Sequence, residues 1–211
     1  TISHADALGS SAAGTTIATG AELRLTGGII LSSEAITLNG QGVSAAGALR
    51  SSAGSNTVSS AITLASAARI NSDAATLILS GGVSSTDQGM TIGGAGNVTV
   101  STIGLSLGTG GLTKDGLGIL TLTSANSFTG ATLISAGTLT AASGALAGTS
   151  GITVNGATLT AVNVNAAATL TLNATGLATI SAVDQTVGAV TNANATDANA
   201  LNFTASTGTI T

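Results

Sequence analysis

The sequence predicts an all-β protein of the β-solenoid class, forming one elongated domain over residues 1–211. Short runs in which apolar and polar residues alternate recur along the chain, and each ends at Gly, Asn or Ser, which is the pattern of half-buried strands closed by tight turns. These turns leave no room for crossover helices, so the strands must stack coil on coil or pair as hairpins. The composition favours stacking, because charged residues are 6% and aromatic residues 1% of the chain, with no Pro or Cys. An antiparallel sandwich carries a charged solvent face and an aromatic core instead.

The alternating runs place strands along nearly the whole chain. Residues 1–20 are small and polar and predict a loosely packed first coil. Residues 191–211 predict a terminal coil or assembly segment. The expected strands are at residues 22–26, 29–31, 35–40, 61–64, 68–71, 76–80, 90–92, 97–100, 105–107, 119–123, 132–134, 138–140, 151–156, 157–160, 168–173, 178–180, 201–204 and 207–211.

The clearest repeat runs from Gly110 to Ser143, as GGLTKDGLGILTLTSANSFTGATLISAGTLTAAS. This stretch resembles the autotransporter-associated β-strand repeat of bacterial autotransporter passenger domains. Upstream, residues 47–82 are similar to the segment that precedes such a repeat in large adhesin-like members, so the resemblance covers residues 47–143. It implies a right-handed parallel β-helix located outside the cell, at the bacterial cell surface.

The stretch departs from the family pattern at two positions. Ile119 stands where the family usually has Thr, and Phe128 stands where it usually has Tyr. Both changes keep the bulk of the side chain and remove a hydroxyl group. We therefore expect them to alter surface chemistry and to leave the fold intact.

Charge is unevenly distributed along the sequence. The chain has four basic and eight acidic residues and a net charge of −4; every Lys and Arg and six of the eight acids lie at or before Asp115, and residues 116–183 contain none. An exposed β surface of this length without charges is prone to aggregate, which predicts either that other subunits cover it or that ordered aggregation is its role. Four basic residues give no footprint for nucleic acid, and no run of about 18 apolar residues predicts a membrane-spanning helix.

Residues able to carry chemistry are few. His4 is the single histidine and has only Asp6 near it, which predicts no metal site, and no cofactor site is expected. The many serines have no credible base, so no catalytic residue is assigned and we expect no enzyme activity. Phe128 and Phe203 are the only aromatic residues, too few for a sugar-binding cleft. The acids in turn-like sequence are Asp73, Asp87, Asp115, Asp184 and Asp197.

Two further motifs leave alternatives open. Residues 114–116 (Lys-Asp-Gly) predict a turn in which Asp115 bonds its own backbone, and an isopeptide bond from Lys114, the sole lysine, is the alternative. Thr-x-Thr pairs suit the exposed side of a strand, and the alternative is a threonine array that binds ice. The pairs are Thr121/Thr123, Thr138/Thr140, Thr158/Thr160 and Thr169/Thr171.

Taken together, these features predict a structural protein that assembles with copies of itself into an extracellular filament or matrix. Alternation continues to the last residue, so we expect terminal coils with unpaired edges that stack end to end. The residues assigned to this contact are Leu201, Phe203, Thr207, Thr209, Ile210 and Ile2. The alternative is a monomeric, adhesin-like passenger fragment that binds host or matrix surfaces.

Overall fold

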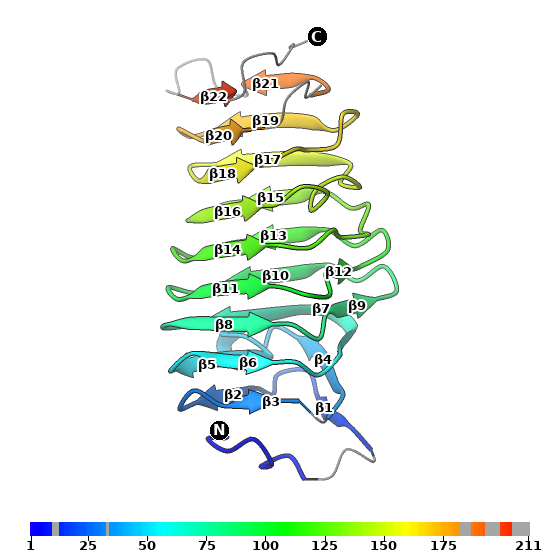
Figure 1. Ribbon diagram of the computed structural model, residues 1–211, viewed down its shortest axis with the longest axis vertical. Coiled ribbons are helices and arrows are strands. Elements are labelled where there is room, and N and C mark those ends of the chain that lie inside the picture. The colour runs from blue at the N-terminus through cyan, green and yellow to red at the C-terminus, as the bar shows by residue number, and fades with distance from the viewer. Residues whose placement is uncertain (10–12, 33, 182–186, 193–198, 204–211) are drawn as a thin grey trace.

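The protein is a stack of parallel coils, as a computed structural model shows for residues 1–9, 13–32, 34–181, 187–192 and 199–203. Every strand pair among these residues is parallel. The only helical segment in the described chain is the 3₁₀ turn η1 (Val43–Ala45). The coils rise from the N-terminal end at the bottom of Figure 1 to the C-terminal end at the top, and the predicted β-solenoid is confirmed.

Two parallel sheets form the walls of the solenoid. The thirteen-stranded sheet contains β1 (Thr15–Ile17), β2 (Leu23–Thr26), β4 (Ile36–Gly40), β5 (Leu49–Ala53), β7 (Ile62–Ser72), β9 (Val83–Ser85), β10 (Met90–Gly93), β12 (Leu105–Ser106), β13 (Leu112–Lys114), β15 (Thr132–Ile134), β17 (Gly151–Asn155), β19 (Thr169–Asn173) and β21 (Val190–Asn192). The nine-stranded sheet contains β3 (Ile30–Leu31), β6 (Asn56–Val58), β8 (Thr76–Leu79), β11 (Asn97–Val100), β14 (Ile119–Leu122), β16 (Thr138–Ala141), β18 (Thr158–Ala161), β20 (Leu177–Ile180) and β22 (Ala200–Phe203).

The coil is right-handed, as the resemblance implied. In Figure 1 the strands of the nine-stranded sheet lie toward the viewer and point to the right, while β10, β13, β15, β17 and β19 of the thirteen-stranded sheet lie behind and point to the left as the chain climbs. This hand follows from the right-handed twist of strands, which favours right-handed crossovers between parallel neighbours.

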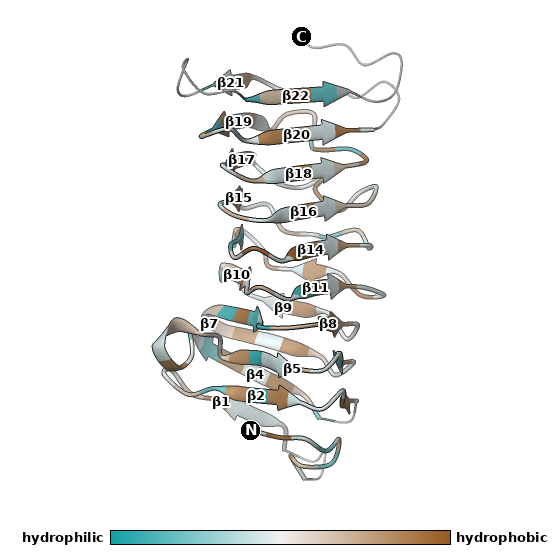
Figure 2. Ribbon diagram, turned by 90° about the vertical axis from the view of Figure 1, so that its left-hand side faces the viewer, coloured by the Kyte–Doolittle hydropathy of each residue, from teal (hydrophilic) through white to brown (hydrophobic). Residues whose placement is uncertain are grey.

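Side chains that point inward form continuous columns in the interior. In the nine-stranded sheet, Leu77 aligns with Val98, Leu120, Leu139 and Leu159, one residue on each successive coil. All five are buried. Figure 2 shows the matching alternation of hydrophobic and hydrophilic residues along the strands. The period of two in the sequence therefore sets which side chains stack inside, and their burial supplies the main stabilisation.

The coils change shape partway along the stack. Up to β12, a short third side is formed where β1, β4, the first half of β7, β9 and β12 pair in succession. From β15 onward, each coil contributes one strand to each sheet. The first part of the solenoid is thus wider in section than the second.

Most predicted strands are confirmed, with two kinds of difference, and the strand predicted at 207–211 lies outside the described residues. The segments predicted at 61–64 and 68–71 join into the single bent strand β7, which serves two sides of the coil. The loosely packed first coil contains a paired strand, because β1 aligns with β4. The strands that the pattern missed are short or rich in small polar residues; they are β1, β5, β6, β9, β13 and β21.

Candidate functional site

The six residues assigned to end-to-end contact fall at opposite ends of the stack or outside the described chain. Ile2 is half-buried and pairs with the second coil, donating its N–H to the carbonyl of Arg24 at 2.8 Å. Leu201 lies in β22 and packs against the core. The backbone of Phe203 ends β22. Thr207, Thr209 and Ile210 lie outside the described residues, so the predicted contact remains a prediction.

His4 and Asp6 form an exposed pair at the N-terminal end. The distance from His4 Nδ1 to Asp6 Oδ2 is 3.7 Å, and both side chains are more than three-quarters exposed. Throughout the described ranges, no three His, Cys, Asp or Glu residues gather as metal ligands. Within the same part of the chain, no helix is long and apolar enough to cross a membrane.

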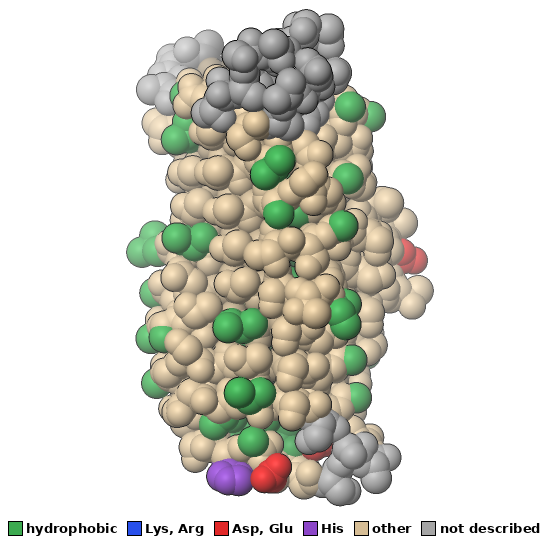
Figure 3. All heavy atoms as spheres, in the orientation of Figure 1, with side chains coloured by type: hydrophobic (Ala, Val, Ile, Leu, Met, Phe, Trp, Pro, Cys, Tyr) green, Lys and Arg blue, Asp and Glu red, His purple; other side chains and the backbone are tan. Residues whose placement is uncertain are grey.

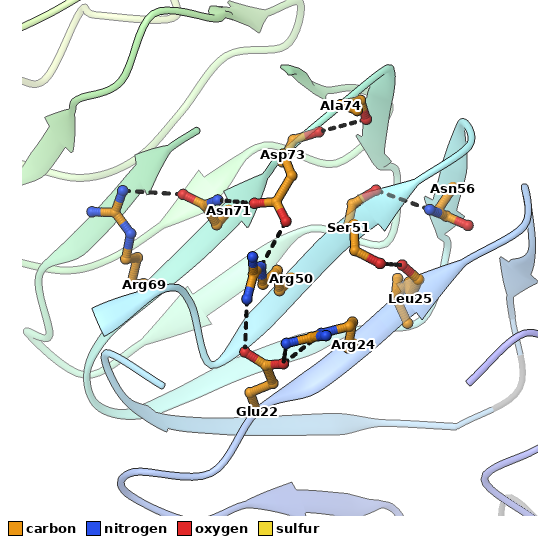
Figure 4. A network of polar contacts seen from close by, with 12 residues as sticks. Glu22, Arg24, Leu25, Arg50, Ser51, Asn56, Arg69, Asn71, Asp73 and Ala74 are labelled. Atoms are coloured by element: carbon orange, nitrogen blue, oxygen red, sulfur yellow. Dashed lines mark hydrogen bonds and ion pairs between the residues drawn. The ribbon is translucent and has the colours of Figure 1, made fainter. Parts of the chain in front are cut away.

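A ladder of charged side chains runs along the outside of the first coils. Glu22 pairs with Arg24 at 2.5 Å and with Arg50 on the next coil at 3.5 Å. Arg50 also pairs with Asp73 at 2.7 Å. Burial lowers the pKa of Arg50, but the hydrogen bond and charge of Asp73 and the charge of Glu22 together raise this pKa above its usual value. Figure 4 shows these contacts linking neighbouring coils.

The ladder continues through Asn71 to Arg69. Asn71 donates to Asp73 at 2.7 Å and accepts from Arg69 at 3.0 Å. Arg69 then forms a bidentate pair with Asp115, at 2.6 and 2.7 Å. Gly93 lies between them in the stack, and a Cβ there would come within 1.9 Å of Asp115 Oδ1. The missing side chain at Gly93 lets an ion pair reach across an intervening coil.

Lys114 lies inside the solenoid at the end of β13. It aligns with Ile92 on one side and Ile134 on the other, and its side chain is only 2% exposed. Its Nζ donates to the carbonyl oxygens of Asp115 and Gly116, both at 2.7 Å, and to Ala136 of the next coil at 3.2 Å. Burial lowers the pKa of Lys114 to about 8, against the opposing effect of the Asp115 charge. The ammonium group therefore clamps three carbonyls at a corner of two coils.

This arrangement corrects the prediction for the Lys-Asp-Gly turn. The carboxylate of Asp115 bonds Arg69, not its own backbone. The contacts of Lys114 Nζ are backbone carbonyls, and condensation of the amine with a backbone amide would break the main chain, so the geometry does not favour an isopeptide bond. The alternation of the strand did indicate that Lys114 points inward, because Leu112 is inward and Thr113 outward in the same strand.

The two departures from the family pattern have different locations. Ile119 is 42% exposed at the start of β14, so this departure lies at the surface, and its effect on surface chemistry stays a prediction. Phe128 is only 1% exposed, so the prediction of a surface change is wrong there. A phenyl ring in the core packs without needing a partner for a hydroxyl group.

The remaining acids have individual surroundings. Asp87 is exposed in a turn, and the backbone N–H of Thr109, which donates to Asp87 Oδ1 at 2.7 Å, lowers the pKa of that carboxyl. Asp184 and Asp197 lie outside the described residues. Asp73 and Asp115 are both engaged by arginines, so the described part of the chain brings no free pair of carboxylates together.

The outer face of the nine-stranded sheet carries no charged residue. Its central column is Thr99, Thr121, Thr140, Thr160 and Thr179, aligned rung by rung. In Figure 3, which views this face, acidic and histidine side chains appear only at the lower end and the right edge. The predicted outward positions of Thr121, Thr140 and Thr160 are thus confirmed.

Comparison with known families agrees with the repeat seen in the coils. Residues 112–141 match the family model of the passenger-associated-transport-repeat. The match spans β13 to β16, which are two consecutive coils and include the clamp at Lys114. It confirms the resemblance of this stretch to the repeat of autotransporter passenger proteins. Comparisons with curated proteins and with solved structures give no match.

Proposed function

We propose that this chain is a structural part of a passenger-like protein at the bacterial cell surface, and that it assembles with copies of itself into a filament or matrix. The repeat match supports the class, because passenger repeats belong to secreted or surface proteins. The proposal assigns the chain no catalytic activity and no cofactor. Its principal partner is another copy of the same chain.

The observation that carries the proposal is the lack of charge over residues 116–183. These residues form the coils from β14 to β20, and they expose polar hydroxyl groups and scattered apolar side chains. Regular β surfaces of this kind are normally interrupted by charged residues that prevent association. Their absence here favours a surface that is covered when the protein works.

End-to-end stacking is the assembly mode that the sequence predicts. Within the described residues, every coil is joined to the next by parallel pairing, and an axial contact between two copies would continue the same pairing. A contact of this head-to-tail kind does not close on itself and produces a fibre.

Sedimentation analysis and electron microscopy of the purified protein test the proposal. We expect larger species to grow with protein concentration, and rods longer than one molecule. Raising the salt concentration should not dissolve them, because screening weakens contacts between charges and this surface has none. A single monomeric species over the whole concentration series would contradict the proposal.

The second candidate is a monomeric, adhesin-like binding module that contacts host or matrix surfaces. The repeat match favours it to the same degree, since passenger repeats also carry adhesive domains. It predicts a monomer in sedimentation that retains binding to an immobilised matrix. The charge distribution favours the assembling protein.

A further inference from the structure

We infer that the outer face of the nine-stranded sheet is the surface through which two copies of this chain pack side by side, sheet against sheet. The inference rests on the proposed self-assembly and specifies its contact. It differs from end-to-end stacking, because it uses the wall of the solenoid and leaves the terminal coils free.

The first argument is the composition of this face. Its outward positions hold hydroxyl, amide and apolar side chains and no charged group on any of its nine strands. They are Ile30, Thr57, Thr76, Ile78, Asn97, Thr99, Ile119, Thr121, Thr138, Thr140, Thr158, Thr160, Leu177, Thr179, Ala200 and Asn202. By contrast, the thirteen-stranded sheet presents Arg24, Arg50 and Arg69 on its strands. Among the outward strand positions, charged residues thus lie only on the other sheet.

The second argument is exposed apolar area on the same side. Ile30 is 56% and Ile119 is 42% exposed, and both lie on outward positions of this sheet. Leu117, in the turn that enters β14, is 81% exposed. A groove at the ends of β14, β16 and β18 is lined by threonines of the central column and by Val162, which is 40% exposed. These side chains offer a partner apolar contact next to the threonine columns.

The third argument identifies the partner as a second copy. A contact made on one coil can be repeated on the next only if the partner has the same spacing of about 4.8 Å between strands. A second molecule of the same solenoid necessarily has this strand spacing. It also presents an equally uncharged face, so the contact buries no unpaired charge. Rows of Thr side chains from two such sheets can interdigitate as they do between stacked sheets about 10 Å apart.

The available area fits a reversible contact. Nine strands at this spacing and about four residues across give a face of roughly 40 Å by 13 Å, on the order of 500 Å² per partner. The two partners together then bury about 1,000 Å², the lower bound for a specific interface. We therefore expect side-by-side pairing that depends on protein concentration.

Charge insertion tests which wall makes the contact. The first variant carries Thr121→Lys and Thr160→Lys, two coils apart on the nine-stranded sheet. The matched control carries Thr113→Lys and Thr153→Lys, also two coils apart but on the outer face of the thirteen-stranded sheet. Circular dichroism checks that both variants fold. Sedimentation equilibrium is then measured for both and for the unmodified chain.

The inference predicts that the first variant loses the side-by-side contact and keeps at most end-to-end species, so that its average mass falls below that of the control, which associates like the unmodified chain. If the first variant also associates like the unmodified chain, this inference is overturned while the proposed function stands. If both variants lose association equally, the contact is not specific to the nine-stranded sheet and the inference is likewise overturned. An unmodified chain that is always monomeric overturns both proposals.

A crosslinking measurement checks the geometry independently. The chain contains no cysteine, so a single Thr121→Cys substitution on β14, the middle strand of the nine-stranded sheet, gives a unique thiol. Mild oxidation should give disulfide-linked dimers of this variant and few of Thr153→Cys. Equal yields from the two variants argue against the sheet-to-sheet contact. Thermal hysteresis by the monomer, lost in the lysine variant of this face, would assign the face to ice and overturn the second copy as its partner.

Discussion

The coils before Gly116 and those after it share one backbone plan and differ in what surrounds it. Both regions pair in parallel and bury continuous columns of aliphatic side chains. The first region adds a third side and a ladder of ion pairs from Glu22 to Asp115. The second region contains no charged residue as far as Val183 and has one strand per sheet in each coil.

This difference separates the interactions that form the solenoid from those that change its response to pH and salt. Since the uncharged coils keep the same pairing, the ion pairs are not required for the solenoid to form. Backbone hydrogen bonds and burial of inward side chains are common to both regions and carry that role. The charged ladder instead makes the first region sensitive to pH and salt, and leaves the second region free to associate.

Lys114 marks the boundary between the regions, and its removal is the strongest test. We expect Lys114→Ala to lower the free energy of unfolding by about 3–5 kcal/mol, because it leaves a cavity and removes the hydrogen-bond donor to three backbone carbonyls. Denaturant unfolding followed by circular dichroism measures the change. Lys114→Met is the control that restores volume without the donor, and it should recover only part of the loss. A loss below about 0.5 kcal/mol for Lys114→Ala, the usual size of a surface effect, would refute the clamp.

The lowered pKa of Lys114 predicts that the free energy of unfolding depends on pH in the alkaline range. The pKa of Lys114 is about 8 in the folded chain and 10.5 for an unperturbed lysine, so between these values the unfolded state binds more protons. The free energy of unfolding should therefore rise with pH across this window, by up to about 3 kcal/mol. No Tyr, Cys or second Lys is present, so no other side chain titrates there. Thermal unfolding at several pH values measures the rise, which Lys114→Met should lack; the same rise in that variant would exclude Lys114 as its cause.

The fold could be predicted from the sequence because the pattern that determines it, alternating residues closed by turn residues, lies within each short segment. Alternation and turn residues are visible in the repeated segments, as in the stretch from Ile119 to Ala141. Each strand then pairs with the equivalent strand of the next coil, so no distant partner has to be found. Strands such as Val83–Ser85 were missed because three small residues carry too little alternation to read. The pairing of Arg69 with Asp115 could not be predicted, because it joins residues 46 positions apart and depends on the space at Gly93.

The interior position of Lys114 was not predicted, for a different reason. A lysine followed by Asp and Gly suggests an exposed turn, and local propensity favoured that interpretation. The strand pattern that begins at Leu112 places the same residue inside. Periodicity was the more reliable signal here, because the turn supplied carbonyl groups that satisfy a buried ammonium group.

The pair of Arg69 and Asp115 gives the smallest expected effect and separates the two regions most directly. Their side chains are 16% and 33% exposed, so we expect Arg69→Met to cost about 1–2 kcal/mol and the coupling in a cycle with Asp115→Asn to be about 1 kcal/mol at low salt. The coupling should shrink as salt screens the charges.

Hydrogen exchange locates the effect of this substitution along the stack. Faster exchange should concentrate in β7, β10 and β13, which the pair connects, while β18 and β20 keep their protection because neighbouring coils interact mainly with each other. Equal loss of protection in β18 and β20 would mean that the solenoid unfolds as one cooperative unit. In that case the charged ladder would stabilise the uncharged coils as well as its own.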